Sequence, residues 1–215
     1  MKNQRHYSVM DQICLGMDQV LRAVCGHPQT SHRPCPGKEE AEPVLTREQQ
    51  KHSAALMRIN HAGEVCAQAL YHGQGLASRS PWIKEKMQQA MHEEGDHLAW
   101  CQLRLQQLGS HTSYLNPVWY AGSFVMGLTA GWLGDKWSLG FLAETEAQVV
   151  KHLQSHLQRL PVADNKSYKI LMQMQEDESH HQEEAIKAGA AVLPEWVKKL
   201  MHVMSRVMVM TTRWV

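Results

Sequence analysis

Two short segments of the sequence place an acidic and an imidazole side chain at a spacing that could bind metal. Glu94 and His97 are three residues apart, and Glu178 and His181 repeat the same spacing. Residues three apart on an α-helix lie on one face, so each pair would present its carboxylate and its imidazole together. Two Glu-x-x-His pairs on separate helices are typical of bundles in which carboxylates hold two metal ions.

Both pairs lie on apolar stripes. The stripe around Glu178 and His181 consists of Leu171, Met174, Ala185, Ala188 and Val192, and the stripe around Glu94 consists of Met87, Met91, Leu98, Cys101, Leu105 and Leu108. An uncompensated carboxylate on such a face would cost several kcal/mol, whereas a solvated glutamate belongs on the opposite face. A bound cation would compensate these acids. The alternative, structural salt bridges on the helices, does not explain why the acids and histidines fall on apolar stripes.

A bundle of this kind needs one more inward glutamate from each of two further helices. Residues 46–77 offer Glu64, and residues 136–160 offer Glu146 on a face with Leu142 and Leu153. Glu144 is the rival acid, but it shares its face with polar side chains. The predicted metal ligands are therefore Glu64, Glu94, His97, Glu146, Glu178 and His181.

The donor set indicates the metal. Four carboxylates and two imidazoles suit iron or manganese better than zinc or copper. Two iron ions could supply two electrons to O2. Asp177, directly before Glu178, could accept a hydrogen bond from the ligand histidine of the opposite helix, although a solvated aspartate is an equal alternative.

The ligands also reveal an internal repeat. Glu64 and Glu146 are 82 positions apart, and Glu94 and Glu178 are 84 apart, as are His97 and His181. Each half is a helix with one glutamate followed by a helix with Glu-x-x-His. The sequence therefore predicts an all-α fold, a four-helix bundle with an internal two-helix repeat.

Helix boundaries can be read from capping residues and breakers. Thr46 with Gln49 forms a capping-box pattern, and Ser80-Pro81 starts the second helix, which ends near Gly109. Pro161 ends the third helix, and the fourth is expected from 163 to 192. Gly63 indicates either a close backbone approach or a tolerated glycine.

The remaining segments are accessory. Residues 1–25 have the pattern of an amphipathic helix and residues 26–45 that of a linker, which together make an N-terminal extension (1–45) before the main domain (46–215). Residues 116–134 carry no formal charge and have small residues at Ser123, Gly127 and Gly131. They are expected to be a buried or membrane-dipping segment rather than a true span.

The C-terminal helix, 194–213, carries a broad apolar face that includes Trp196, Leu200, Met204 and Met208, flanked by basic residues. Such a helix suits an anionic membrane surface, and packing on the bundle or on a dimer partner is the alternative. We therefore expect accessory membrane-associated helices at 116–134 and 194–213, whereas the helix of residues 1–25 is expected to be a packing or docking helix.

Composition narrows the functional class. A net charge of +1 over 215 residues argues against a nucleic-acid partner. The five cysteines include no Cys-x-x-Cys spacing, which favours a reducing compartment without a structural zinc or rubredoxin-like iron site. No cleavable signal peptide is expected, because the charged start lacks an apolar stretch.

Residues 58–74, RINHAGEVCAQALYHGQ, resemble the first-helix signature of the demethoxyubiquinone hydroxylase family, ferritin-like di-iron monooxygenases of ubiquinone biosynthesis. The resemblance covers Thr46 to the C-terminus and implies the same six ligands. Cys66 departs from the glycine expected there, which affects packing but removes no ligand.

The resemblance implies an oxidoreductase with two iron ions per chain that uses O2 to hydroxylate the ring of a polyprenylated demethoxy-benzoquinol. NADH or another electron donor would supply the electrons, since the sequence has no nucleotide-binding fingerprint of its own. The expected location is peripheral, on the lipid surface of the cytoplasmic face of a bacterial inner membrane. Other ubiquinone-biosynthesis proteins and a second copy of the chain are the further partners to be considered.

Three alternatives stay open at this point. A ferritin-like iron-storage protein would use a similar centre but has no use for a basic membrane helix. A di-metal peroxidase, of manganese-catalase or rubrerythrin type, would also use such a centre, and the absence of Cys-x-x-Cys weakens the rubrerythrin type. A non-enzymatic quinone carrier would need no metal. Metal content and oxygen consumption distinguish these classes.

Overall fold

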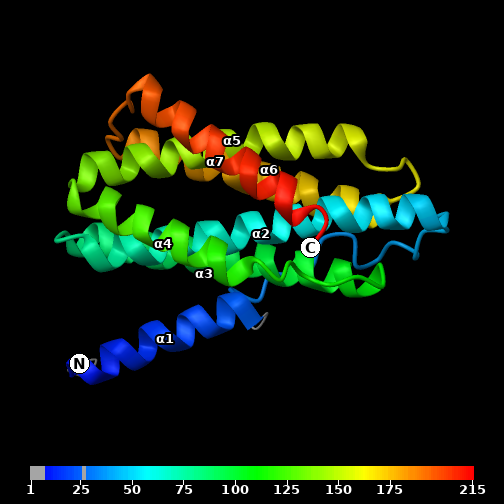
Figure 1. The fold of residues 1–215 in the computed structure, drawn as a ribbon, viewed down its shortest axis with the longest axis horizontal. Helices are drawn as coiled ribbons and strands as arrows, with labels where there is room; N and C mark the ends of the chain where they lie inside the picture. Colours follow the sequence, from blue (N-terminus) through cyan, green and yellow to red (C-terminus); the bar gives the residue numbers. More distant parts are fainter. Residues whose placement is uncertain (1–7, 26–27) are drawn as a thin grey trace.

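The computed structural model describes residues 8–25 and 28–215, which form seven α-helices and no strand (Figure 1). The helices are α1 (Val9–Cys25), α2 (Arg47–Ala77), α3 (Pro81–Gln107), α4 (Asn116–Trp132), α5 (Asp135–Arg159), α6 (Asn165–Lys187) and α7 (Glu195–Thr212). The predicted all-α fold is confirmed. Residues 1–7 of the predicted N-terminal helix lie outside the described residues.

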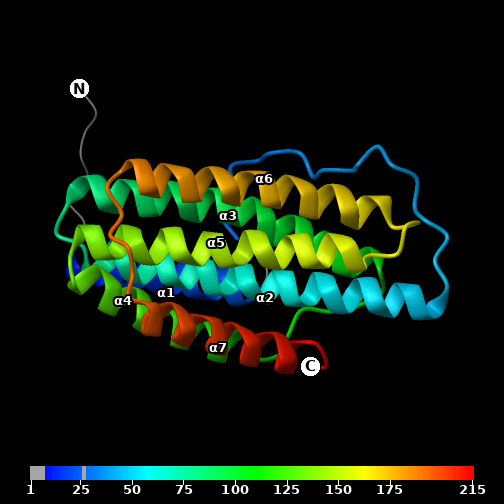
Figure 2. The ribbon, with the colours of Figure 1, turned by 90° about the horizontal axis from the view of Figure 1, so that it is seen from above.

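Four of these helices, α2, α3, α5 and α6, run side by side and form the bundle (Figure 2). The predicted capping box is present at the start of α2, where Thr46 and Gln49 each accept a backbone N–H of the other. Ser80 caps α3 and Asp164 caps α6 through their side chains. These caps satisfy backbone groups that the helix starts would otherwise leave unpaired, and they fix where α2, α3 and α6 begin.

The bundle core is divided along its length. One cluster packs around Met57, Trp100 and Met174, and another around Tyr71, Met87 and Leu142. Along each bundle helix the predicted ligand lies between the two clusters. The charged residues are thus sealed at both ends by close-packed apolar side chains.

Helix α4 connects the two halves and packs directly on α2. A Cβ added to Gly127 would lie 2.1 Å from the carbonyl oxygen of Leu70, and one added to Gly73 would lie 2.4 Å from that of Phe124. The tight contact predicted from the small residues of α4 is therefore present. Within the described residues, α4 and the other helices are all too short or too polar to cross a bilayer.

The predicted end of the fourth bundle helix was wrong. Helix α6 ends at Lys187, not near Val192, because Gly189 adopts a left-handed φ of 95° and turns the chain. Val192, assigned to the buried stripe, is exposed. No described residue approaches the Cβ position of Gly63 within 4 Å, so of the two alternatives for that glycine the structure favours a tolerated glycine over a close backbone approach.

The accessory segments lie against the bundle on two sides. Helix α1 contacts α2 and α4, and residues 28–45 follow the outer side of α3 and α6 (Figure 2). The prediction of a linker over 26–45 missed these contacts, which include a 2.7 Å ion pair between Glu42 and the buried Arg104. Helix α7 lies across the opposite side, over α2 and α5.

Candidate metal centre and its cavity

The six acids and histidines singled out in the sequence converge in the middle of the bundle. Ligand atoms of Glu64, Glu94, His97 and Glu178 all lie within 4.8 Å of one another, and so do those of Glu94, Glu146, Glu178 and His181. Both groups contain Glu94 and Glu178. Two adjoining ligand groups that share two carboxylates would be able to hold a pair of metal ions.

Both imidazoles turn the same nitrogen toward the acids. Nδ1 of His97 lies 2.9 Å from Glu94 Oε2 and 3.1 Å from Glu178 Oε1. Nδ1 of His181 lies 3.2 Å from Glu178 Oε2 and 3.3 Å from Glu94 Oε1. Each histidine therefore contacts a glutamate of its own helix and one of the other repeat, which is the consequence of the three-residue spacing on facing helices.

The rival acid of α5 does not take part. Glu146 is buried in the cluster, whereas Glu144 is half-buried and accepts a hydrogen bond from Gln148 at 2.9 Å. No described residue donates a hydrogen bond to Oε1 of Glu146. A buried carboxylate oxygen without a donor is costly unless a cation binds it.

The charges at this site call for cations. Burial, together with the neighbouring carboxylates, raises the pKa of Glu64 and of Glu146 well above the usual range. Burial alone would lower the pKa of His97, but Glu94, Asp177 and Glu178 raise it well above its ordinary value. The raised pKa values mean that this group of buried carboxylates favours positive charge close to it. The residues fit two hard cations, which would neutralise four buried carboxylates.

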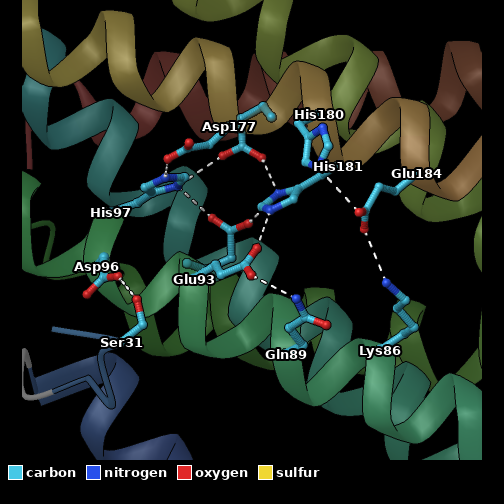
Figure 3. A network of polar contacts seen from close by, with 12 residues as sticks. Ser31, Lys86, Gln89, Glu93, Asp96, His97, Asp177, His180, His181 and Glu184 are labelled. Carbon is cyan, nitrogen blue, oxygen red and sulfur yellow. Dashed lines mark hydrogen bonds and ion pairs between the residues drawn. The ribbon is translucent and has the colours of Figure 1, made fainter. Parts of the chain in front are cut away.

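The outer nitrogen of each histidine binds an acid of the other repeat (Figure 3). Nε2 of His97 lies 2.9 Å from Asp177 on α6, and Nε2 of His181 lies 2.6 Å from Glu93 on α3. The bond considered in the sequence between Asp177 and the opposite histidine is present. These contacts fix the tautomer and the ring orientation that present Nδ1 to the centre.

Sequence reasoning missed Glu93, although a signal existed. Glu93 and Asp177 each precede the glutamate of a Glu-x-x-His pair and are 84 positions apart, the offset of the repeat itself. Applying the repeat to Asp177 would have identified Glu93. Arg33, which donates to Asp177 at 2.8 Å, had no such signal, because it belongs to a segment outside the repeat.

A cavity of about 300 Å³ reaches the cluster from the side covered by α4 and α7. Its inner wall includes Glu64, Glu146 and Glu178, and Gly63 lines it as well. The outer wall consists mainly of apolar side chains: Leu70, Val118, Met126, Phe141, Val149, Met201, Met204 and Met208. This volume is at the lower end of the range for pockets that bind small organic molecules.

Helix α7 divides its apolar residues between two directions. Met204 and Met208 line the cavity, whereas Trp196 is 70% exposed and Leu200 is also exposed on the surface. The predicted broad stripe is therefore a cavity wall on one side and a solvent-facing apolar surface on the other.

Comparison with known proteins identifies the family. The sequence profile of the family described as "Ubiquinone biosynthesis protein COQ7" matches residues 51–212. The chain is 50% identical to a 3-demethoxyubiquinol 3-hydroxylase of Nitrosococcus oceani, over 98% of this chain and 99% of that protein. It is 53% identical to one of Polynucleobacter necessarius, over 95% and 98% of the two chains. It is 52% identical to one of Acinetobacter baumannii, over 97% and 98%.

The similarity to these relatives also covers more of the chain than the family resemblance described from the sequence. That resemblance began at Thr46, whereas the match to the Nitrosococcus oceani protein spans 211 of the 215 residues, so most of the N-terminal extension is shared. The chain therefore belongs to the ubiquinone biosynthesis protein COQ7 family and is an enzyme of the hydroxylase class to which these relatives belong.

Proposed function

We propose that the protein is a di-iron monooxygenase that hydroxylates the ring of a polyprenylated 3-demethoxyubiquinol with O2. The observation that carries the proposal is the cavity whose inner wall is formed by Glu64, Glu146 and Glu178 and whose outer wall is apolar. An aromatic ring in this cavity would lie against the carboxylates that hold the metal. The names of the curated relatives support this substrate class.

The proposed ligands divide into two sets that share Glu94 and Glu178. Glu64 and His97 would complete one position, and Glu146 and His181 the other. When bound, two iron ions would supply two electrons to O2, so that one oxygen atom enters the ring and the other leaves as water. The residues keep the imidazole Nδ1 atoms facing inward and hold four carboxylates in a water-poor core.

The cavity walls determine what the protein does with its substrate. Apolar side chains such as Leu70, Phe141 and Met204 would pack on the ring and exclude water, which limits unproductive loss of reduced oxygen. Asn60 and His152 also line the cavity, and within the described residues Asn60 Nδ2 and His152 Nε2 have no hydrogen-bond partner. Both residues are therefore candidates to hydrogen-bond the oxygen substituents of the ring.

The proposal includes a peripheral position on the cytoplasmic face of a bacterial inner membrane. Helices α4 and α7 flank the cavity and expose apolar side chains, among them Val125, Trp132 and Trp196. The exposed cations Lys199, Arg206 and Arg213 on and beside α7 would be attracted to anionic lipid. A polyprenyl tail could then stay in the bilayer while the ring enters between the helices.

The membrane part of the proposal is tested with outward-facing residues. Truncation before Pro194 would remove a wall of the cavity, so the double variant Trp196→Glu, Leu200→Glu is the sharper tool. Neither residue lines the cavity. The variant should lose flotation with anionic vesicles and retain its iron, and undiminished flotation would contradict the assignment of this surface.

The reaction is tested with labelled oxygen. The iron-loaded protein is supplied with a demethoxyquinol, labelled O2 and NADH, or in parallel a separate reductase, because the electron donor is part of the proposal. Label in a new ring hydroxyl is the expected result. Label found only in water or peroxide with the ring unchanged would contradict the proposal and favour an iron-storage protein or a peroxidase.

A further inference from the structure

Residues 28–45, the N-terminal strap, connect the two helices that carry the Glu-x-x-His pairs. At one end of the strap Glu42 forms ion pairs with Arg104 of α3 at 2.7 Å and with Lys166 of α6 at 2.8 Å. Glu40 pairs with Lys169 of α6. The strap therefore binds both helices from the outside of the bundle, on the side opposite α4 and α7 (Figure 2).

A glycine within the first Glu-x-x-His pair allows the other end of the strap to approach. A Cβ added to Gly95 would lie only 1.7 Å from the carbonyl oxygen of Gln29. Any other residue at this position would therefore displace the strap from α3. Gly95 lies between Glu94 and Asp96, so the backbone of the strap packs against the ligand-bearing turn itself.

This close approach places Arg33 beside a predicted ligand. Its Nε donates to Asp96 at 3.0 Å and its Nη1 donates to Asp177 at 2.8 Å. The guanidinium also lies over the ring of Trp100, 4.9 Å from the centroid. Arg33 thus holds one acid of α3 and one acid of α6 through a planar group with a fixed geometry.

The two acids depend on Arg33 in different ways. The side chain of Asp96 is 1% exposed, and its other partner is the hydroxyl of Ser31, so Arg33 supplies its neutralising charge. Oδ2 of Asp177 accepts from both Arg33 Nη1 and His97 Nε2, while Gln173 donates to Oδ1. The arginine therefore fixes the carboxylate that in turn orients His97.

We propose that the strap helps to orient the ligands of the metal centre and that Arg33 is a positioning residue for His97. Arg33 acts through Asp177, and its Nη2 also lies 3.4 Å from Nε2 of His97, so that the imidazole is held with Nδ1 toward Glu94 and Glu178. This inference rests on the proposed di-iron function. It gives a function to the strap, which lies outside the four bundle helices. It concerns only the metal position that includes His97.

The first test compares two strap contacts. Arg33→Gln removes the guanidinium, whereas Lys169→Gln breaks the exposed pair with Glu40 and leaves Arg33 in place. Both variants and the unchanged protein are loaded with iron, and release to a chelator is followed together with Mössbauer spectra. Substitution of groups that orient ligands typically weakens metal binding by about 10- to 100-fold. Since Arg33 acts through Asp177, we expect about tenfold faster release of one iron and an altered spectrum for that iron alone.

The second test displaces the strap without changing a charge. Gly95→Ala removes a helix-weakening glycine but should push Gln29 away from α3. Its iron release should resemble that of Arg33→Gln, although the helix itself gains stability. Arg33→Lys keeps the charge without the planar geometry and should restore the spectrum only in part. This pair of variants keeps the test valid if Arg33→Gln folds poorly.

The outcomes separate this inference from the proposed function. If the unchanged protein binds no iron, the di-iron proposal fails and this inference fails with it. If the unchanged protein binds two irons, and Arg33→Gln and Gly95→Ala release both irons at its rate with its spectrum, only the role of Arg33 is contradicted. Equally fast iron release from Lys169→Gln and Arg33→Gln would likewise contradict the role of Arg33, because a general loosening of the strap would then be the cause.

Discussion

The two repeats supply the same ligands but surround them differently. His97 is fully buried, and its partner Asp177 is held by Arg33 and Gln173. The side chain of His181 is 10% exposed, and its partner Glu93 receives a hydrogen bond from Gln89 but pairs with no arginine among the described residues. The position equivalent to the buried Asp96, 84 residues along the chain, is His180, which is exposed on the surface of α6.

This difference follows from what covers each repeat. The strap lies against Gly95 and Asp96, whereas on the side of His181 a small cavity is lined by Trp82, Lys86 and Glu93. A repeated sequence therefore produced equivalent ligands, and a segment outside the repeat made the two positions inequivalent. We infer that the His97 position is the more rigid and the His181 position the more accessible.

The largest expected effect is at a residue that both positions share. Glu178→Ala removes a carboxylate from both ligand groups, so the variant should lose both irons while keeping its helical content. His97→Ala removes a ligand from one group alone and should lose chiefly one iron. Metal analysis with circular dichroism measures both effects.

Glu144→Ala is the matched control, because Glu144 lies on the same helix as Glu146 but outside the cluster. It should keep two irons. Full iron content in Glu178→Ala, or a loss in Glu144→Ala, would contradict the ligand assignment.

The next effect compares the two acids that orient the histidines. Asp177→Asn and Glu93→Gln each keep the shape of the side chain and remove its charge. Changes of this kind weaken metal binding by about 10- to 100-fold. The loss should be larger for Asp177→Asn, because that change also leaves Arg33 facing an amide, while Glu93 is more exposed. Iron affinities measured by competition with a chelator test which variant binds iron more weakly. Equal losses of affinity would contradict the inferred difference between the two metal positions.

Much of this arrangement could be predicted from the sequence, because helix periodicity and apolar surroundings are local properties. The apolar stripes identified Glu146 over Glu144, and the repeat offset aligned the two halves. The length of α6 was overestimated, because Val192 continued the apolar spacing although Gly189 had already turned the chain. The strap could not be predicted, because the contact between Arg33 and Asp177 joins residues 144 positions apart with no shared pattern.

The accessibility of the two positions gives a kinetic prediction. A small hydrophilic chelator should remove iron from the fully assembled protein in two phases, the faster phase from the position completed by Glu146 and His181. His181 is partly exposed beside a small cavity, whereas His97 is sealed by the strap and Trp100. Stopped-flow absorbance resolves the phases, and His181→Ala should eliminate the faster one. A single phase in the unchanged protein would show that the two positions open together.

The smallest expected effect is that of Lys86, a cation near the more exposed His181 position, and it tests the comparison between the two metal positions. Lys86 lines the small cavity next to His181, but its ammonium pairs with Glu184 at 3.2 Å and both side chains are substantially exposed. Exposed pairs of this kind contribute about 0 to 1 kcal/mol. Lys86→Gln should therefore leave both iron content and release rates within error of the unchanged protein. Arg33→Gln removes one positive charge from the strap beside the other repeat, but that charge faces a buried acid. Matching iron losses in these two variants would mean that any nearby cation supports the centre, and the geometry of Arg33 would then have no special role.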